Sequence, residues 1–245
     1  PPPLFSSAAS DVYKRQIQDG GTETDQQNID GDGEFLTVKS SSTLATGATT
    51  KAANVTGDSV TVTVESGSTI SANTVAVFGD TTSDLTVTNS GTITASGTTA
   101  IDAKATTNAT ITNNSGGTIS SNRNTIRVSK TTGVGAANTT GMTITNSGTI
   151  TATNGSAIFG TAAGNTVTIT NNAGGEMTNS DSDNATIRVG VSSSVTNSGT
   201  IKNDVGSDSI KLYGNNATVT LKDQGIVVGK IAVSYTHLTL PTRRG

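Results

Sequence analysis

Short stretches in which apolar and polar residues alternate recur along most of this chain. The clearest spans 143–151 and reads TITNSGTIT, two alternating segments on either side of the corner Asn-Ser-Gly. Strict alternation over a few residues is typical of a half-buried β-strand. Thr, Val, Asn and Gly are mediocre or poor helix formers, and no 3.6-residue apolar spacing accompanies them. The pattern therefore predicts an all-β protein built from short strands.

Near-copies of this unit return about every 25 residues as an internal repeat. The apolar residue that follows each corner falls at Leu44, Ile70, Ile93, Ile119, Ile150, Met177, Ile201 and Ile226. The strand before each corner is expected to open at Thr37, Thr61, Thr86, Thr110, Thr143, Thr168, Ser194 and Thr218. A third alternating segment follows in most units, such as TIRVSK from 125. Each repeat is therefore predicted to contain three short strands.

Three strands and their turns in one repeat match one coil of a parallel β-helix. In that fold each strand pairs with the equivalent strand one coil later, about 4.8 Å away, so that like residues stack in columns. A β-sandwich would instead need hairpin turns between antiparallel strands, and its units would have no reason to repeat. We predict a single-stranded right-handed parallel β-helix of about eight coils, with Ile and Val inside and Thr outside.

The corners carry a recurring asparagine that is expected to form a structural ladder. Its members are Asn89, Asn113, Asn146, Asn171 and Asn197. Asn and Gly tolerate positive φ, which we expect a tight bend to require at this corner. Stacked Asn side chains can also hydrogen-bond from coil to coil. The alternative is a solvated turn whose residues are chosen for backbone conformation alone.

Composition indicates which part of the chain is the folded repeat domain. Hydrophobic residues make up 31% of the chain, and the formal net charge is −3, but the regular apolar spacing argues against disorder. Segments 1–16 and 234–245 hold all four prolines and the only histidine, His237, and resemble artefactual tails in translated environmental DNA assemblies. We expect both to be non-native or disordered and 17–233 to be the folded repeat domain, as a fragment of a longer array.

The repeat domain has few residues that could support catalysis. It contains 11 basic and 17 acidic residues, a net charge of −6, which disfavours nucleic acid or an anionic membrane as a partner. No apolar run reaches the roughly 18 residues of a membrane span, so no direct membrane insertion is expected. Without His or Cys, the domain lacks the usual zinc ligands and general base. We predict no enzyme activity and no cofactor.

One loop has a partial resemblance to a calcium site. In NIDGDGEF, the oxygen-bearing residues Asn28, Asp30 and Asp32, with Gly33 in sixth place, match the first half of an EF-hand loop. The twelfth position is Lys39, where a bidentate Glu is needed. We favour a polar turn that leads into the first strand, with a weak calcium site as the alternative.

The outward residues of the third strand form the other candidate site. Their expected column is Ala76, Asp102, Arg127, Phe159, Arg188 and Lys211. One acid cannot supply the carboxylate pair that glycoside hydrolysis needs, and the loop acids at 181, 183, 204 and 208 are interpreted as solvated turns. Asp102, Arg127, Arg188 and Lys211 could form a charged stripe for a carbohydrate or protein ligand. Alternatively, they keep the sheet soluble and discourage edge pairing.

Threonine forms a second regular feature, two outward rows on the first strand of each coil. The pairs include Thr86 and Thr88, Thr110 and Thr112, Thr143 and Thr145, and Thr168 and Thr170. Hydroxyls about 7 Å apart along a strand and 4.8 Å between strands resemble the array of β-helical ice-binding proteins. Thr is also a β-branched, soluble residue that suits any exposed strand, which is the simpler explanation.

The repeats resemble those of a known class of secreted proteins. VTNSGTI units followed by an AI-x-V strand and a Gly/Asn-rich loop, together with DSIKLYGNNATVTLKDQGIVVGKI at 208–231, are similar to the passenger domains of autotransporters, the type V secreted proteins of Gram-negative bacteria. The resemblance covers 17–233 and implies a β-helix exported through the outer membrane and displayed at the cell surface or released.

For a passenger of this kind, the expected role is structural or adhesive: attachment to a cell-surface or matrix ligand, or self-association of cells, as in a biofilm. A carbohydrate-active or carbohydrate-binding β-helix and an ice-binding β-helix are the alternatives. We also expect 226–233 to expose an apolar edge and the isolated chain to associate as its concentration rises.

Overall fold

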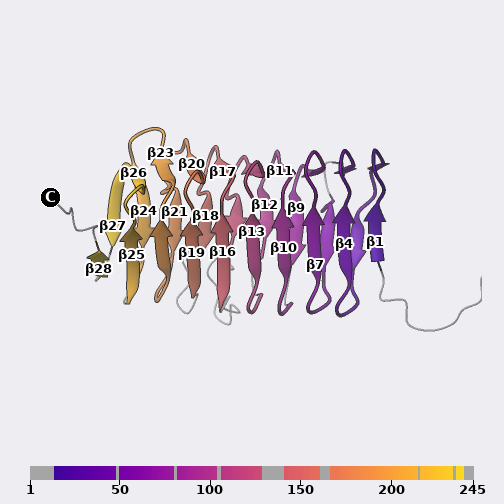
Figure 1. Ribbon diagram of the computed structural model, residues 1–245, viewed down its shortest axis with the longest axis horizontal. Helices are drawn as coiled ribbons and strands as arrows, with labels where there is room; N and C mark the ends of the chain where they lie inside the picture. Colours follow the sequence, from indigo (N-terminus) through magenta and orange to yellow (C-terminus); the bar gives the residue numbers. More distant parts are fainter. Residues whose placement is uncertain are drawn as a thin grey trace, which may run out of the picture.

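The computed structural model describes residues 14–47, 50–79, 82–103, 106–128, 141–160, 166–214, 216–233 and 236–239. Within these ranges all regular structure is β-strand, so the predicted all-β class is confirmed. The strands stack as coils along one axis, three strands to a coil and about eight turns in all, as the repeat predicted (Figure 1). No helix in these ranges is long and apolar enough to cross a membrane.

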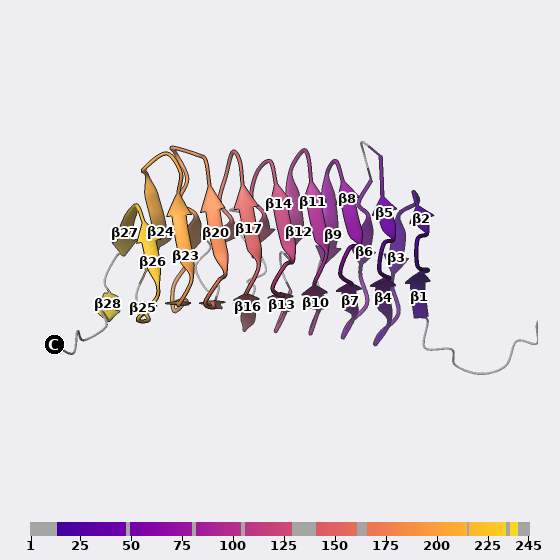
Figure 2. The same cartoon turned by 45° about the horizontal axis from the view of Figure 1, so that its top comes forward.

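Three parallel sheets run the length of the solenoid, and we name them A, B and C (Figures 1 and 2). Sheet A contains β1 (Lys14–Ile17), β4 (Phe35–Val38), β7 (Thr61–Val64), β10 (Thr86–Asn89), β13 (Thr110–Asn113), β16 (Met142–Asn146), β19 (Val167–Asn171), β22 (Ser194–Asn197), β25 (Ala217–Leu221) and β28 (Thr236–Thr239). Sheet B contains β2 (Thr22–Glu23), β5 (Thr43–Ala45), β8 (Thr69–Ala72), β11 (Thr92–Ala95), β14 (Thr118–Ser121), β17 (Thr149–Ala152), β20 (Glu176–Asn179), β23 (Thr200–Asn203) and β26 (Ile226–Val228). Sheet C contains β3 (Gln27–Ile29), β6 (Ala53–Val55), β9 (Val75–Gly79), β12 (Thr99–Asp102), β15 (Ile126–Arg127), β18 (Ile158–Gly160), β21 (Ile187–Val189), β24 (Asp208–Leu212) and β27 (Lys230–Val233).

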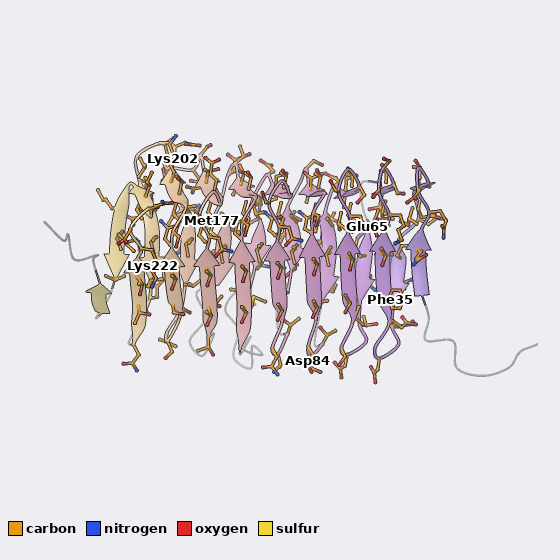
Figure 3. The ribbon with its side chains drawn as sticks, in the orientation of Figure 1. Phe35, Glu65, Asp84, Met177, Lys202 and Lys222 are labelled. Atoms are coloured by element: carbon orange, nitrogen blue, oxygen red, sulfur yellow. The ribbon has the colours of Figure 1, made fainter. Side chains whose placement is uncertain are left out.

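The core is the space that the three sheets enclose. Most strands of sheets A and B alternate half-buried and buried residues, as period-two alternation predicts. The buried apolar residues form one continuous cluster along the axis, and Met177, labelled in Figure 3, is one of its members. Fully burying one Ile or Leu contributes about 1.5–3 kcal/mol. Since each coil covers only its neighbours, stability is close to a sum over coils and their interfaces.

In two of the columns expected from the sequence, the residue predicted at one end is not the one that lies in register. Phe35 pairs with Thr61 and Thr37 with Thr63, so the first of these strands opens at Phe35, and the prediction of Thr37 was wrong. At the other end Val227 pairs with Ile201, whereas Ile226 pairs with Thr200 and is 54% exposed. Val227 therefore continues the inward column. Ile226, together with the exposed Val228, adds apolar surface to the outer face of β26, in the segment expected to expose an apolar edge.

Left-handed residues occur at the expected corner between sheets A and B, at Gly20, Ser41, Gly67, Gly116 and Gly174. A second column of them precedes sheet A in nearly every coil, at Gly33, Ser59, Asp84, Asn108, Gly141, Ser192 and Asn216. In the three-residue Asn-Ser-Gly corners at 89–91, 146–148 and 197–199 neither the asparagine nor the glycine has positive φ, so the prediction was wrong there, whereas it holds for the longer corners at Gly116 and Gly174. Asp84, labelled in Figure 3, is one member of this left-handed column. The backbone therefore takes positive φ at the corner into sheet A and at the longer corners between sheets A and B, but not at the three-residue Asn-Ser-Gly corners.

Both segments set apart in the sequence contribute strand residues. Strand β1 begins at Lys14 and pairs in parallel with β4. Strand β28 spans Thr236–Thr239 and pairs in parallel with β25. The remainder of these segments, 1–13, 234–235 and 240–245, lies outside the described residues.

Candidate functional site

The five corner asparagines form one buried ladder between sheets A and B. The side-chain amide of each donates to the side-chain oxygen of the next, at 2.8 Å from Asn89 to Asn113 and from Asn113 to Asn146. The two later steps, through Asn171 to Asn197, measure 2.9 and 2.8 Å. All five side chains are fully buried. The ladder is therefore closed to ligands and acts on the scaffold.

Backbone carbonyls share the same donors. Asn146 Nδ2 also donates to Gly148 O at 3.0 Å in its own corner and to Glu176 O at 3.1 Å in the next coil. The ladder begins at Asn89 because Val64 occupies its position in the preceding coil, and Asn89 Oδ1 is buried without a hydrogen-bond partner. Each internal asparagine thus ties a corner to two neighbouring coils.

A second buried asparagine column lies between sheets B and C and was missed in the sequence. Asn179 and Asn203 end consecutive strands of sheet B and pair with each other. Asn203 Oδ1 accepts from the backbone N–H groups of Val205 and Ser207, each at 3.1 Å. The sequence contains a signal for this column, because each Asn ends the second alternating segment of its repeat, as in EMTN and TIKN.

Sheet A presents threonine in two rows. Thr86, Thr110, Thr143 and Thr168 are in register along the first, followed by Ser194 and Thr218. Thr88, Thr112, Thr145 and Thr170 are in register along the second, followed by Thr196 and Thr220. All of these except Thr168 and Thr218, which are exposed, are half-buried. The outer face of sheet A is therefore a regular hydroxyl surface without charge over these coils.

Sheet B carries a similar surface beside shallow hollows. Two hollows, of about 340 and 330 Å³, lie along the C-terminal ends of the sheet B strands. Thr94 and Ser96 line both of them. Hydroxyls of neighbouring coils are linked there, with Ser120 Oγ 3.0 Å from Thr94 Oγ1. Hydroxyl and amide groups line these hollows, and neither a ring nor a charged group does.

Sheet C differs, because its outer column contains rings and charges. In register the column reads Asn28, Asn54, Phe78, Asp102, Arg127, Phe159, Arg188 and Lys211. The prediction of Ala76 in this column was wrong: Phe78 pairs with Asp102, and Ala76 is fully buried. The other five residues expected in this column are brought together by the register of β12, β15, β18, β21 and β24.

The first part of this column is closed by contacts among its members and with Lys51. Lys51 Nζ lies 3.2 Å from the centroid of the Phe78 ring and 3.0 Å from Asn54 Oδ1. Asn54 Nδ2 in turn donates to Asn28 Oδ1 at 3.1 Å. A cation on a ring face is held by the ring quadrupole. Phe78 is thereby covered and only 7% exposed.

Asp102 and Arg127 form a bidentate ion pair in the middle of the column. Arg127 Nε donates to Asp102 Oδ1 at 2.9 Å, and Nη2 donates to Oδ2. The Asp102 side chain is 1% exposed and that of Arg127 26%. A buried carboxylate is costly unless it is paired in this way. Asp102 therefore holds Arg127 and does not present its charge at the surface, which removes it from the exposed stripe.

The last part of the column is a cluster of Phe159, Arg188, Lys211 and Tyr213, which we call the cation–aromatic cluster. Arg188 Cζ lies 5.6 Å from the centroid of the Phe159 ring and 5.3 Å from that of Tyr213. Lys211 Nζ lies 5.5 Å from the Tyr213 centroid. The distances are those of cation–π contacts, which fix a cation over a ring. Tyr213 was not singled out in the sequence, although tyrosine is rare in this chain.

The two cations of this cluster, Arg188 and Lys211, have incomplete polar partners. Arg188 Nη1 donates to Asn184 Oδ1 at 3.1 Å, while its Nε is buried without a hydrogen-bond partner. Lys211 Nζ lies 3.7 Å from Asp208 Oδ2, a loose pair between partly exposed groups. Among the ion pairs of the described residues none involves Arg188. Within the described part of the chain Arg188 is thus a positioned guanidinium without a carboxylate partner.

The calcium candidates are held by different partners. Asn28 Oδ1 accepts from Gln26 and Asn54, whereas Asp32 Oδ1 accepts from the backbone N–H of Asp58 at 2.9 Å. In the described ranges no group of three His, Cys, Asp or Glu residues could hold a metal ion. The loop carboxylate of Asp181 is likewise engaged locally, by the N–H of Asp183 and the amide of Asn184, each at 2.8 Å.

Other charged contacts lie at the solvated corners, and their pKa shifts follow from their partners. Lys39 Nζ and Glu65 Oε1 are 2.7 Å apart, and this hydrogen bond raises the pKa of Lys39 and lowers that of Glu65. A second hydrogen bond of this kind, from Lys202 Nζ to Asp204 Oδ1 at 2.7 Å, raises the pKa of Lys202. Glu65 and Lys202 are both labelled in Figure 3. These pairs are partly exposed and solvent-screened, so they stabilise little.

Comparisons with family models, curated proteins and solved structures found no match to this chain. The surfaces described above and the resemblance in the repeats are therefore the basis for inferring a function.

Proposed function

We propose that this chain is a rigid β-helical scaffold displayed at a bacterial cell surface, and that it attaches the cell to a ligand through the outer face of sheet C. The resemblance of the repeats to autotransporter passengers supports the display. A parallel β-helix suits the scaffold role because each coil stacks on the next and extends the molecule without a flexible joint.

One contrast carries the choice of face. Sheets A and B present mainly Thr and Ser along their central coils, whereas sheet C presents Phe159, Arg188, Lys211 and Tyr213 together. Aromatic residues and Arg dominate the binding energy of protein interfaces, while Ser and Thr contribute little. The proposal is one of binding, because the acid of this column, Asp102, is already held by Arg127.

Removing the cations of the cluster is expected to abolish most of the attachment. Beads coated with the purified chain would be tested against extracellular-matrix and cell-surface preparations, for the double variant Arg188→Ala, Lys211→Ala and for the control Thr88→Ala, Thr112→Ala on sheet A. We expect at least about tenfold weaker attachment for the first variant, since loss of a hot spot costs 2 kcal/mol or more. Equal attachment by both variants, with unchanged circular dichroism, would contradict the proposal.

Ice binding is a second candidate, and the register of sheet A favours it. Two rows of Thr hydroxyls run in step across β10, β13, β16 and β19, so the hydroxyls repeat at about 7 Å along the strand and 4.8 Å across it. If this face binds ice, the chain shows thermal hysteresis, and Thr145→Leu in the middle of the face removes most of it. Thr94→Leu on sheet B is the matched control and leaves hysteresis unchanged. Absence of hysteresis and of crystal shaping in the parent chain would eliminate this candidate.

A further inference from the structure

The cation–aromatic cluster has the features of a site for an anionic group. Its guanidinium lies near two rings, Phe159 from the preceding coil and Tyr213 from the following one. A third contact, to Asn184 Oδ1, fixes one end of the guanidinium. An arginine held in this way loses little conformational freedom when it binds a ligand, so its affinity for that ligand is higher.

Arg188 and Lys211 have N–H donors and positive charge that their neighbours do not fully engage and that an external anion can use. Guanidinium has five N–H donors in a planar fork; the donation to Asn184 occupies one of them and Nε is buried, so the remaining donors of Nη1 and Nη2 are those that a ligand can use. The fork matches the two oxygens of a carboxylate or a sulfate. Lys211 Nζ, only loosely paired with Asp208, supplies a second positive charge on the adjacent coil. The unpaired charge of Arg188 and the partly paired charge of Lys211 therefore point to an oxyanion as the ligand.

We infer that Arg188 and Lys211 bind the carboxylate or sulfate groups of an acidic polysaccharide that runs along sheet C, with a sugar ring against Tyr213. This inference rests on the proposed function and names its ligand class. A linear polymer parallel to the axis meets equivalent positions on successive coils, which are about 4.8 Å apart. The apolar face of a sugar ring can pack on an aromatic ring such as that of Tyr213. A simple inorganic ion makes no such contact, so the ring favours a sugar as the ligand.

The remaining charge of the molecule argues against the denser polyanions. Duplex DNA carries one negative charge per about 1.7 Å of its axis and is bound through many basic contacts. The repeat domain, with its net charge of −6, repels such a polymer. A polysaccharide with one acidic group per sugar needs only a few cations, as this cluster provides.

Calorimetric titration of the purified full chain tests the inference. The probes are polygalacturonate oligomers for carboxylate, dextran sulfate for sulfate, neutral dextran, and polyglutamate of equal charge. We expect saturable binding of at least one acidic polysaccharide and none of neutral dextran. The carboxylate and sulfate arms show which anion is preferred. Polyglutamate binding as tight as that of the preferred polysaccharide would overturn the inference, because charge alone would then explain the affinity.

Variants locate the site and separate charge from geometry. Arg188→Gln is expected to weaken polysaccharide binding about tenfold or more, and Arg188→Lys to weaken it by a smaller factor, because lysine keeps the charge without the planar fork. Tyr213→Leu is expected to weaken the polysaccharide but not inorganic sulfate. Lys222→Gln removes an exposed charge from another corner and is expected to change affinity less than twofold.

Three outcomes would overturn the inference, and they differ in what they mean for the proposed function. Equal affinities for Arg188→Gln and Lys222→Gln, both folded by circular dichroism, would place any polysaccharide site elsewhere. If coated beads still attach through sheet C but no acidic polysaccharide binds, the ligand class is wrong and the adhesive function stands. If neither attachment nor binding occurs, both fail.

Discussion

Asn146→Val is expected to destabilise the protein by about 3 kcal/mol, because it interrupts the asparagine ladder in its middle. The substitution leaves Asn171 Oδ1 without its donor at 2.9 Å, and Asn113 Nδ2 loses its shortest acceptor bond, at 2.8 Å, and keeps only the longer ones to the carbonyls of Gly117 and Thr149. The carbonyl of Glu176 loses a donor as well. Each buried polar group left without a partner costs about 1–3 kcal/mol. The change is measured as the shift of the urea unfolding midpoint.

Asn89→Val provides the matched control at the end of the same ladder. Asn89 Oδ1 already lacks a partner, and the preceding coils carry Val38 and Val64 at this position. The substitution removes one unsatisfied acceptor and creates another at Asn113, so we expect a cost of about 1 kcal/mol or less. Equal destabilisation by the two variants would show that the ladder does not couple the coils, and that each asparagine acts only within its own corner.

Much of the scaffold could be predicted because the repeat reports the same feature many times. In sheets A and B the alternation of Ile or Val with Thr specifies which side chains face inward, and it persists from β7 to β23 with few exceptions. Side chains of one type then align in columns, so the register of Thr86, Thr110 and Thr143 follows from matching the repeats. The parallel, three-sheet arrangement is a consequence of those columns.

Sheet C was harder to predict because its strands depart from strict alternation. In β9 the consecutive residues Ala76, Val77 and Phe78 are all buried, and Ala76 and Phe78 are two residues apart, so period-two alternation does not show which of them lies in the outer column. Strands of this sheet also vary from two to five residues, which leaves less repeat to match. Tyr213 lies just beyond β24, outside any alternating pattern. The candidate site depends on these irregular positions.

Corner conformations could be predicted only in part, for a different reason, since the expected positive φ occurs at Gly116 and Gly174 but not at Gly148. The left-handed column uses Ser59, Asp84 and Ser192 as well as glycine and asparagine. Ser and Asp have no sequence signature that requires positive φ, so the path of the chain into sheet A, more than the residue type, imposes this conformation. Conversely, the glycine of the Asn-Ser-Gly corner is needed for space, which a sequence pattern cannot distinguish from a need for φ.

Gly148→Ala tests that close approach and is expected to destabilise the protein by at least about 3 kcal/mol, or to prevent the surrounding coils from folding. A Cβ at Gly148 would lie 2.5 Å from the carbonyl oxygen of Asn114 and closer still to that of Gly117. Both atoms belong to the backbone of the preceding coil, so no side-chain rotation relieves the overlap. The coils must move apart, which breaks the hydrogen bond from Thr149 N to Gly117 O at 2.9 Å.

Gly116→Ala separates this steric effect from the loss of backbone freedom. Gly116 has φ of +81° and open space where a Cβ would lie, so alanine there brings strain without overlap. Such strain costs about 1–2 kcal/mol. We therefore expect the unfolding midpoint to fall modestly for Gly116→Ala and much further for Gly148→Ala. A Gly148→Ala variant no less stable than Gly116→Ala would mean that the coils are not in contact at this corner, and that the Asn-Ser-Gly repeat is retained for some property other than the close stacking of its backbone.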